Sequence, residues 1–143
     1  EFFDYACPYC KASNPHVDRL LQEDKNLRVV YRELPILGPD SVTAARLSLE
    51  ASQLGRFAKF HDALWAAGRP APETLSSAAQ SAGIQPTPKA DPVIEAELKR
   101  NFELAGRLGA TGTPLFVIGD RVMNGAVGYD SLKQAIAAAR AKS

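Results

Sequence analysis

The sequence has few cysteines, no long hydrophobic run and almost no net charge. Its only cysteines are Cys7 and Cys10, and two cysteines exclude both a multi-disulfide scaffold and a four-cysteine metal site. No run of about 18 apolar residues occurs, which excludes a transmembrane helix. The 17 Lys and Arg against 16 Asp and Glu leave a net charge of +1. That balance predicts neither a nucleic-acid partner nor binding to an anionic membrane.

The residues that are present are typical of one folded domain. Apolar residues make up 45% and charged residues 23% of the 143 positions, which is close to the average for globular domains. No signal peptide pattern occurs, yet the sequence opens at Glu1 directly into the strand-forming residues Phe2, Phe3 and Tyr5. We therefore expect an N-terminal strand and a leader upstream of Glu1.

The hydrophobic pattern predicts the order β-α-β, then three or four helices, then β-β-α. Pro15 lies within the first helix, where it removes one backbone donor. Ser41 is the expected N-cap of the second helix, and Gly119-Asp120 the expected hairpin turn. The expected strands cover 1–6, 27–34, 115–118 and 121–123, and the expected helices cover 8–23, 41–54, 57–67, 73–82, 91–108 and 129–141.

The pair Cys7-Pro8-Tyr9-Cys10 stands where the first strand passes into the first helix. A helix start carries unpaired N–H groups and the positive end of the helix dipole, so it should lower the pKa of the Cys7 thiol. Cys10 follows one turn later, close enough for a disulfide that accepts two electrons by thiol exchange. Pro8 suits the first helical turn, where no N–H partner is needed.

Two other interpretations of the cysteine pair stay open. A static disulfide closing so short a loop would constrain the unfolded chain little. A zinc or copper site would need further ligands, and the sequence offers only His16 and His61. We interpret His61 as a helix residue satisfied locally rather than as a catalytic one. Redox exchange is the favoured interpretation, because C-x-x-C near a β-α-β pattern is typical of it.

Thr113-Pro114 immediately precedes the third strand. A proline at a strand start loses no ladder hydrogen bond, and X-Pro bonds are nearly the only ones found in the cis form. Next to a C-x-x-C pair, this position favours a cis Thr113–Pro114 bond.

The pattern from Glu1-Phe2-Phe3 to Cys10, with Thr113-Pro114 about 100 residues later, resembles the DsbA-like thiol:disulfide oxidoreductases of the thioredoxin superfamily. The resemblance covers essentially the whole chain. It implies an α/β thioredoxin fold, 1–143, in which a helical block of about 40–108 is inserted between core halves 1–34 and 109–143.

The same resemblance implies catalytic roles for four residues. Cys7 matches the exposed nucleophile, Cys10 its buried partner and Pro114 the cis-proline that packs against the disulfide. Glu1 matches a buried acid beneath the disulfide that moves protons to and from the buried thiol. No metal and no cofactor are implied.

Substrate contacts are implied for four others. Pro8 and Tyr9 are the variable dipeptide that tunes the redox potential, and Tyr9 replaces the histidine common in the oxidases. Thr113 matches a residue whose backbone pairs with an extended substrate. Gly125 matches a loop beside the site.

The implied function is the introduction of disulfides into cysteine-containing exported polypeptides. The implied location is periplasmic or otherwise extracytoplasmic, with a membrane redox partner that recycles the disulfide and no nucleic-acid partner. A reductase or isomerase of the same fold is the main alternative, and a copper- or zinc-binding protein is a further one.

Overall fold

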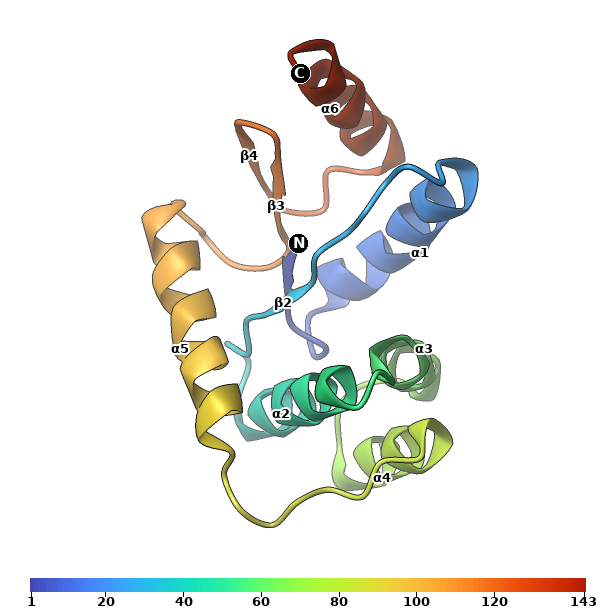
Figure 1. Cartoon of the computed structure of the whole chain (residues 1–143), viewed down its shortest axis with the longest axis vertical. Helices are drawn as coiled ribbons and strands as arrows, with labels where there is room; N and C mark the ends of the chain where they lie inside the picture. The colour runs from blue at the N-terminus through green and yellow to red at the C-terminus, as the bar shows by residue number, and fades with distance from the viewer.

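The computed structural model describes all residues, 1–143, as an α/β fold around one four-stranded sheet (Figure 1). The elements in chain order are β1 (Phe2–Phe3), α1 (Pro8–Glu23), β2 (Arg32–Glu33), α2 (Pro39–Gln53), α3 (Phe57–Ala67), α4 (Pro72–Ala82), α5 (Pro92–Arg107), β3 (Leu115–Ile118), β4 (Arg121–Asn124) and α6 (Tyr129–Ala141). The predicted fold class and element order are confirmed. None of the helices combines the length and the apolar character needed to span a bilayer.

The strands lie in the order β2-β1-β3-β4, with β1 parallel to β2 and antiparallel to β3. β3 and β4 form a hairpin in which Ile118 pairs with Arg121, so Gly119-Asp120 is the two-residue turn expected from the sequence. Gly119 has φ +61°, a backbone conformation that favours glycine.

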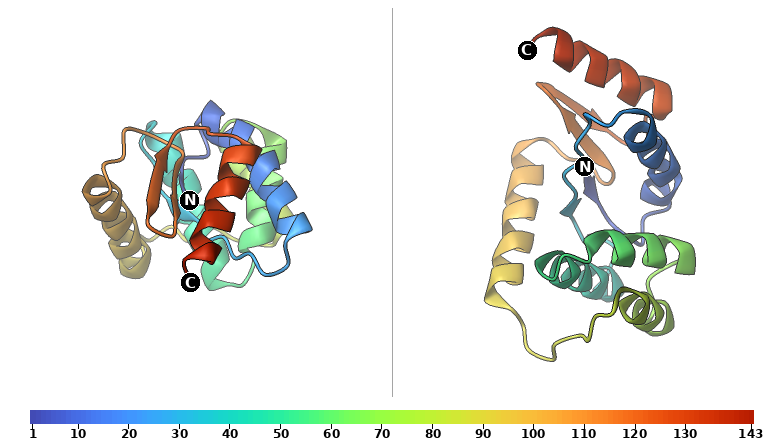
Figure 2. Two further views of the ribbon diagram at one scale, coloured as in Figure 1. Left: turned by 90° about the horizontal axis from the view of Figure 1, so that it is seen from above. Right: turned by 45° about the vertical axis from the view of Figure 1, so that its right-hand side comes forward.

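Helices cover both faces of the sheet, as the two views in Figure 2 show. α1 and α6 pack together on one face, where Val17, Leu20, Phe116 and Leu132 form a buried cluster. α5 covers the opposite face through a cluster that contains Phe2 and Leu115 of the strands and Ala105 of the helix. α5 therefore lies on the sheet, although it belongs to the stretch between β2 and β3 that contains no strand.

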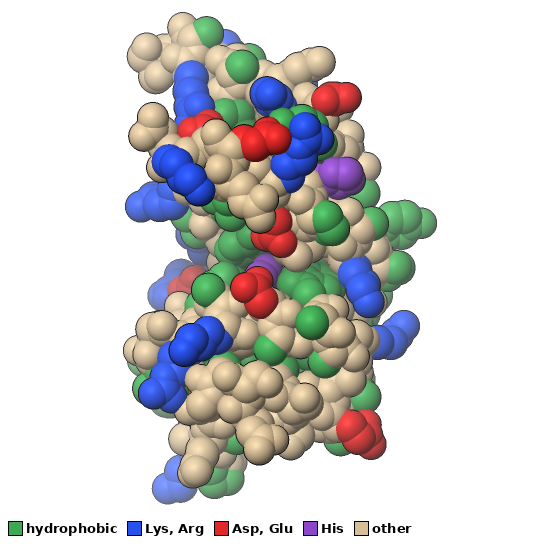
Figure 3. All heavy atoms as spheres, turned by 90° about the vertical axis from the view of Figure 1, so that its right-hand side faces the viewer, with side chains coloured by type: hydrophobic (Ala, Val, Ile, Leu, Met, Phe, Trp, Pro, Cys, Tyr) green, Lys and Arg blue, Asp and Glu red, His purple; other side chains and the backbone are tan.

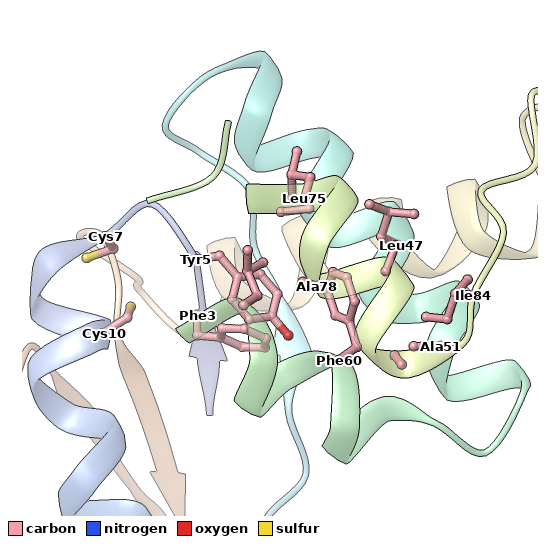
Figure 4. Packing of buried hydrophobic residues seen from close by; sticks show 14 residues of the cluster. Phe3, Tyr5, Cys7, Cys10, Leu47, Ala51, Phe60, Leu75, Ala78 and Ile84 are labelled. Atoms are coloured by element: carbon pink, nitrogen blue, oxygen red, sulfur yellow. The ribbon is translucent and has the colours of Figure 1, made fainter. Parts of the chain in front are cut away.

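α2, α3 and α4 form a separate group at one end of the sheet (Figure 1). Their small residues, such as Ala44, Ala51 and Ala78, allow close helix packing around Phe60 and Leu64. The same cluster includes Phe3 and Tyr5 of the first strand region and both cysteines. Figure 4 shows the cysteines at one end of this cluster and Ile84 at the other.

Three details differ from the sequence-based expectations. The first two strands have only two residues each. β1 ends where the chain turns at 4–7, and β2 is short because β1 pairs only with Arg32 and Glu33 of the 27–34 segment and leaves 27–31 unpaired. The expected cap Ser41 is wrong: α2 begins two residues earlier, at Pro39. Gly38, with φ +111°, is the N-cap. Proline is well suited to the first helical position, and the buried Ser41 Oγ is left without a hydrogen-bond partner.

Candidate active site

The turn at 4–7 carries the first cysteine and is held by Asp4. The Asp4 carboxylate accepts hydrogen bonds from the backbone N–H groups of Ala6 (2.8 Å), Ile36 (2.8 Å) and Leu37 (3.0 Å). The Asp4 carbonyl accepts a further bond from the Cys7 N–H at 3.0 Å. One buried residue therefore joins the turn to the 34–38 loop and fixes where α1 begins.

Cys7 is the N-cap residue of α1, followed by Pro8 at the first helical position. Its side chain thus stands at the end of the helix where backbone N–H groups have no helical partners. The Cys7 thiol donates a hydrogen bond to the Thr113 carbonyl oxygen at 3.3 Å. The expectation of an exposed nucleophile is wrong for this form of the chain: the residue is 5% exposed, because the 4–7 turn and Thr113 lie against it.

Cys10 lies one turn along the helix and is 1% exposed. Burial raises the pKa of the Cys10 thiol well above its usual value, and the neighbouring Cys7 raises it further. Both cysteines are free thiols in this structure, and Figure 4 shows their side chains next to each other at the start of α1. A pair with one thiol at a helix start and one fully buried is chemically asymmetric.

Thr113, Pro114 and Gly125 belong to two loops that are joined by a hydrogen bond, and the Thr113 carbonyl contacts Cys7. The Thr113–Pro114 peptide bond is cis, and the Pro114 side chain is fully buried. The Pro114 carbonyl accepts a hydrogen bond from the Gly125 N–H at 2.9 Å, which ties the loop after β4 to the loop before β3. Gly125 has φ +91°, a conformation that L side chains rarely adopt.

Several apolar residues near the cysteines are exposed. Pro8 is exposed and Tyr9 is 64% exposed. Ile36 and Leu37, whose N–H groups bind Asp4, are also exposed. On the face shown in Figure 3, hydrophobic side chains gather across the middle, while acidic and basic side chains are intermixed.

Glu1 precedes β1 and is tied to the 28–31 segment. Its ammonium group donates to the Val30 carbonyl at 2.8 Å. Burial raises the pKa of the Glu1 carboxyl to about 7, its own ammonium group opposes that shift, and Asp18 of α1 adds to it. No hydrogen bond joins Glu1 to either thiol in the structure.

Sequence reasoning missed a set of buried polar residues behind the turn. The Tyr5 hydroxyl lies 2.9 Å from His61 Nδ1 and 3.0 Å from Ser48 Oγ. Ser48 donates to Glu33 Oε1 at 2.8 Å, and Trp65 Nε1 donates to His61 Nε2 at 3.1 Å. The expectation that His61 is satisfied locally is therefore only half right. Its partner Trp65 is one helical turn away, but its second hydrogen-bond partner, Tyr5, lies 56 positions away in the sequence. The i, i+4 spacing of His61 and Trp65 was the one signal available in the sequence.

No group of three or more His, Cys, Asp or Glu side chains is arranged to hold a metal ion. His16 is exposed and His61 has both ring nitrogens engaged. The reactive groups that the structure brings together at the start of α1 are the two thiols.

Known proteins resemble the chain over nearly its full length. A 36% identical thioredoxin-like oxidoreductase from Silicibacter pomeroyi superposes with a TM-score of 0.90, over 99% of this chain and 84% of that one. A periplasmic thioredoxin-like protein from Salmonella enterica serovar Typhimurium is 31% identical, with a TM-score of 0.89, over 98% of this chain and 82% of that one. The thiol-disulfide exchange protein alpha-DsbA2 from Wolbachia pipientis is 27% identical, with a TM-score of 0.86, over 96% and 78%.

The curated relatives are much longer proteins. A Na(+)/H(+) antiporter, NhaA 1 of Salinispora arenicola, is 29% identical over 146 residues, which cover 97% of this chain and 22% of the antiporter. The chain thus spans about a fifth of that relative's length. The model of the DSBA-like thioredoxin domain matches residues 1–137. Given this match and a fold shared with thioredoxin-like and DsbA proteins, the chain belongs to the DSBA-like thioredoxin domain family.

Proposed function

We propose that the chain is a dithiol–disulfide oxidoreductase that introduces disulfides into cysteine-containing exported polypeptides. The observation that carries this proposal is the asymmetry of the pair. Cys7 caps α1 beside the Thr113 carbonyl, and Cys10 is buried behind it with a raised pKa. Residues 1–34 and 109–143 supply the redox core in this proposal, and about 40–108 form the helical insertion.

The reaction begins with the Cys7–Cys10 disulfide. A substrate thiolate attacks Cys7 Sγ, a new substrate–Cys7 disulfide forms, and the Cys7–Cys10 bond breaks. Cys10 leaves as a thiolate and takes up a proton, which its raised pKa favours. A second substrate thiolate then attacks the substrate sulfur, and Cys7 leaves as a thiolate at the helix start. Two substrate thiols have become one disulfide, and the enzyme has gained two electrons.

The free energy of this exchange depends on Cys7. Stabilising its thiolate at the α1 N-terminus stabilises the reduced enzyme, which makes the disulfide a stronger oxidant. Tyr9 carries no positive charge, so the stabilisation comes from the helix start and its N–H groups. We propose that a membrane redox partner restores the disulfide by accepting the two electrons.

Substrate contacts follow from the exposed groups around the pair. In the oxidised enzyme Cys7 has no thiol hydrogen, so the Thr113 carbonyl is free to accept an N–H from an extended substrate. Pro8, Tyr9 and the Gly125 loop flank that position. Glu1, with a pKa near 7, is the candidate for proton movement. An extracytoplasmic location is supported by the similarity to a periplasmic protein.

The test is the equilibrium of the pair with reduced and oxidised glutathione. An oxidase is expected to hold its disulfide weakly, with the oxidised chain melting at a lower temperature than the reduced chain. An oxidised form that melts clearly higher contradicts the oxidase proposal. Efficient rescue of a scrambled multi-disulfide substrate, in the same experiment series, points to the isomerase instead.

A further inference from the structure

A continuous chain of hydrogen bonds runs through the protein interior directly behind the cysteine turn. It joins Trp65 to His61 (3.1 Å), His61 to Tyr5 (2.9 Å), Tyr5 to Ser48 (3.0 Å) and Ser48 to Glu33 (2.8 Å). Four of the five residues are buried, and Trp65 packs partly buried against the same cluster. The members come from α3, the 4–7 turn, α2 and β2, so the chain connects four parts of the fold.

The direction of the donors in this chain follows from its Trp65 end. The Trp65 indole N–H can only donate, so His61 Nε2 must accept and Nδ1 must carry the proton of the neutral ring. Burial lowers the pKa of His61 to about 4, which keeps the ring neutral near pH 7. His61 Nδ1 then donates to the Tyr5 oxygen, Tyr5 donates to Ser48, and Ser48 donates to the Glu33 carboxyl. No polar group in the chain lacks a partner.

Tyr5 links this chain to the cysteines. It occupies the second position of the turn whose first and last residues, Asp4 and Cys7, are joined by a backbone hydrogen bond at 3.0 Å. Asp4 anchors the turn to the 34–38 loop, and Tyr5 anchors it to the helices α2 and α3. The Tyr5 ring also packs in the same buried cluster as Cys7 and Cys10, as Figure 4 shows.

We propose that Tyr5 is a positioning residue for the redox pair: its hydroxyl, held between His61 and Ser48, fixes the turn that seats Cys7 at the start of α1. This inference rests on the proposed function of the pair. A thiolate gains from helix N–H groups only within the first turn and only with the right geometry. A turn freed from one of its two anchors lets Cys7 shift relative to the start of α1 and to the Thr113 carbonyl, which lies 3.3 Å from its sulfur, without altering either cysteine.

The test compares the Tyr5→Phe variant with the wild-type chain. Phenylalanine keeps the ring and its packing but removes the hydroxyl, so His61 Nδ1 and Ser48 Oγ lose their shared partner. The expected result is a Cys7 thiolate that titrates at higher pH, followed by its ultraviolet absorbance. The equilibrium constant for reduction by glutathione is expected to fall by roughly tenfold, equivalent to one pKa unit. Ser48→Ala, which breaks the chain at its next member, is expected to shift both quantities in the same direction.

A control separates positioning from loss of stability. Leu98→Ala removes a buried side chain from the small cluster of Ala45, Ile94 and Leu98, which contains neither Tyr5 nor a cysteine. It is expected to lower the melting temperature while leaving the Cys7 titration and the glutathione equilibrium unchanged.

The possible outcomes lead to different conclusions. Folded Tyr5→Phe and Ser48→Ala variants with wild-type titration and equilibrium overturn the positioning role of Tyr5. A Leu98→Ala variant that shifts the equilibrium as much as Tyr5→Phe also overturns it, because the effect is then one of general stability. A wild-type chain that forms no glutathione-exchangeable disulfide contradicts the proposed function itself, and that result is read before any variant is compared.

Discussion

The Cys7 thiol donates to the carbonyl oxygen of Thr113 at 3.3 Å, across 106 positions of sequence. This bond places the loop before β3 on the first cysteine and gives the Thr113 carbonyl its one side-chain donor. Formation of a Cys7 disulfide removes the donor hydrogen, so the carbonyl loses its partner when the pair is oxidised. Under the proposed function, the same oxygen is then available to a substrate N–H.

The two cysteines are expected to differ in their ability to form mixed disulfides. Cys10→Ser leaves the nucleophile at the start of α1 without a partner to release the substrate, so an adduct with glutathione should accumulate. Cys7→Ser leaves only Cys10, which is 1% exposed and has a raised pKa, so no adduct is expected. Mass spectrometry of each intact variant after incubation with oxidised glutathione measures the fraction that carries the glutathione adduct. Equal labelling of the two variants contradicts the assigned roles.

Replacement of Asp4 tests the anchor on the other side of the turn. In Asp4→Asn, the side-chain amide places a donor near the N–H groups of Ile36 and Leu37, which are donors too. The free energy of unfolding is expected to fall by about 2–4 kcal/mol, measured by urea denaturation. Asp62→Asn, an exposed change within α3, is the control and should cost less than about 0.5 kcal/mol. A stable Asp4→Asn variant means that these hydrogen bonds contribute little.

A side chain at Gly125 is expected to lower the free energy of unfolding, because of the backbone conformation at this position. Its φ of +91° lies outside the range that alanine prefers, although nothing lies within 4 Å of an added Cβ. Gly125→Ala should therefore destabilise the chain by about 1–2 kcal/mol and slow exchange, because the Gly125 N–H holds the Pro114 carbonyl.

Gly106→Ala is the matched control for that change. Gly106 lies within α5, has open space around it and no positive φ. Alanine there should stabilise the helix by about 0.5–1 kcal/mol. A loss of stability in both variants, or in neither, contradicts the backbone explanation.

The cysteine site was predictable because its signals are local. Cys7, Pro8 and Cys10 lie within one helical turn, and the preference of proline for that position depends only on backbone geometry. Likewise, the helix expected over 91–108 begins within one residue of its predicted start: Asp91 is the N-cap of α5, and its carboxylate accepts from the Val93 N–H at 2.8 Å.

The contacts between distant segments were not predictable in this way. Tyr5 and His61 are each ordinary core residues in sequence, and only the packing of α3 against the turn brings them to 2.9 Å. The length of β2 was overestimated because the alternating pattern of 27–34 says nothing about where the neighbouring strand begins. Ser41 was misread because Pro39 and Gly38 together define an earlier helix start.

The acidity of Glu33 gives the stability of the chain a testable pH dependence. Burial raises the pKa of the Glu33 carboxyl to about 7, and the nearby Glu97 adds to the shift. Ser48 and Arg32 oppose it. The folded chain therefore keeps this proton up to about pH 7, whereas the unfolded chain releases it near its ordinary value of 4.5. The contribution of this proton to the free energy of unfolding is fully present below pH 4.5, the ordinary pKa of the carboxyl. It is lost as the pH rises through the folded-state pKa of about 7, a change of about 3 kcal/mol.

Two other buried groups contribute to the overall pH profile. Glu1, with its carboxyl pKa raised to about 7, acts in the same direction as Glu33. His61, with its pKa lowered to about 4, acts oppositely, since the unfolded chain takes up a proton below its ordinary value of 6.5. A comparison of Glu33→Gln with the wild-type chain cancels both contributions and isolates Glu33.

Unfolding free energies of both chains, measured by urea denaturation from about pH 5 to about pH 8, give the test. Glutamine carries no charge at any pH and can still accept the Ser48 hydrogen bond. The stability of Glu33→Gln relative to the wild-type chain should therefore increase as the pH rises, with the steepest change about midway between the unfolded pKa of 4.5 and the folded pKa of about 7. Glu103→Gln, at an exposed position of α5, should show a flat difference. A flat difference for Glu33→Gln as well means that the folded chain holds the Glu33 proton no more tightly than the unfolded chain does.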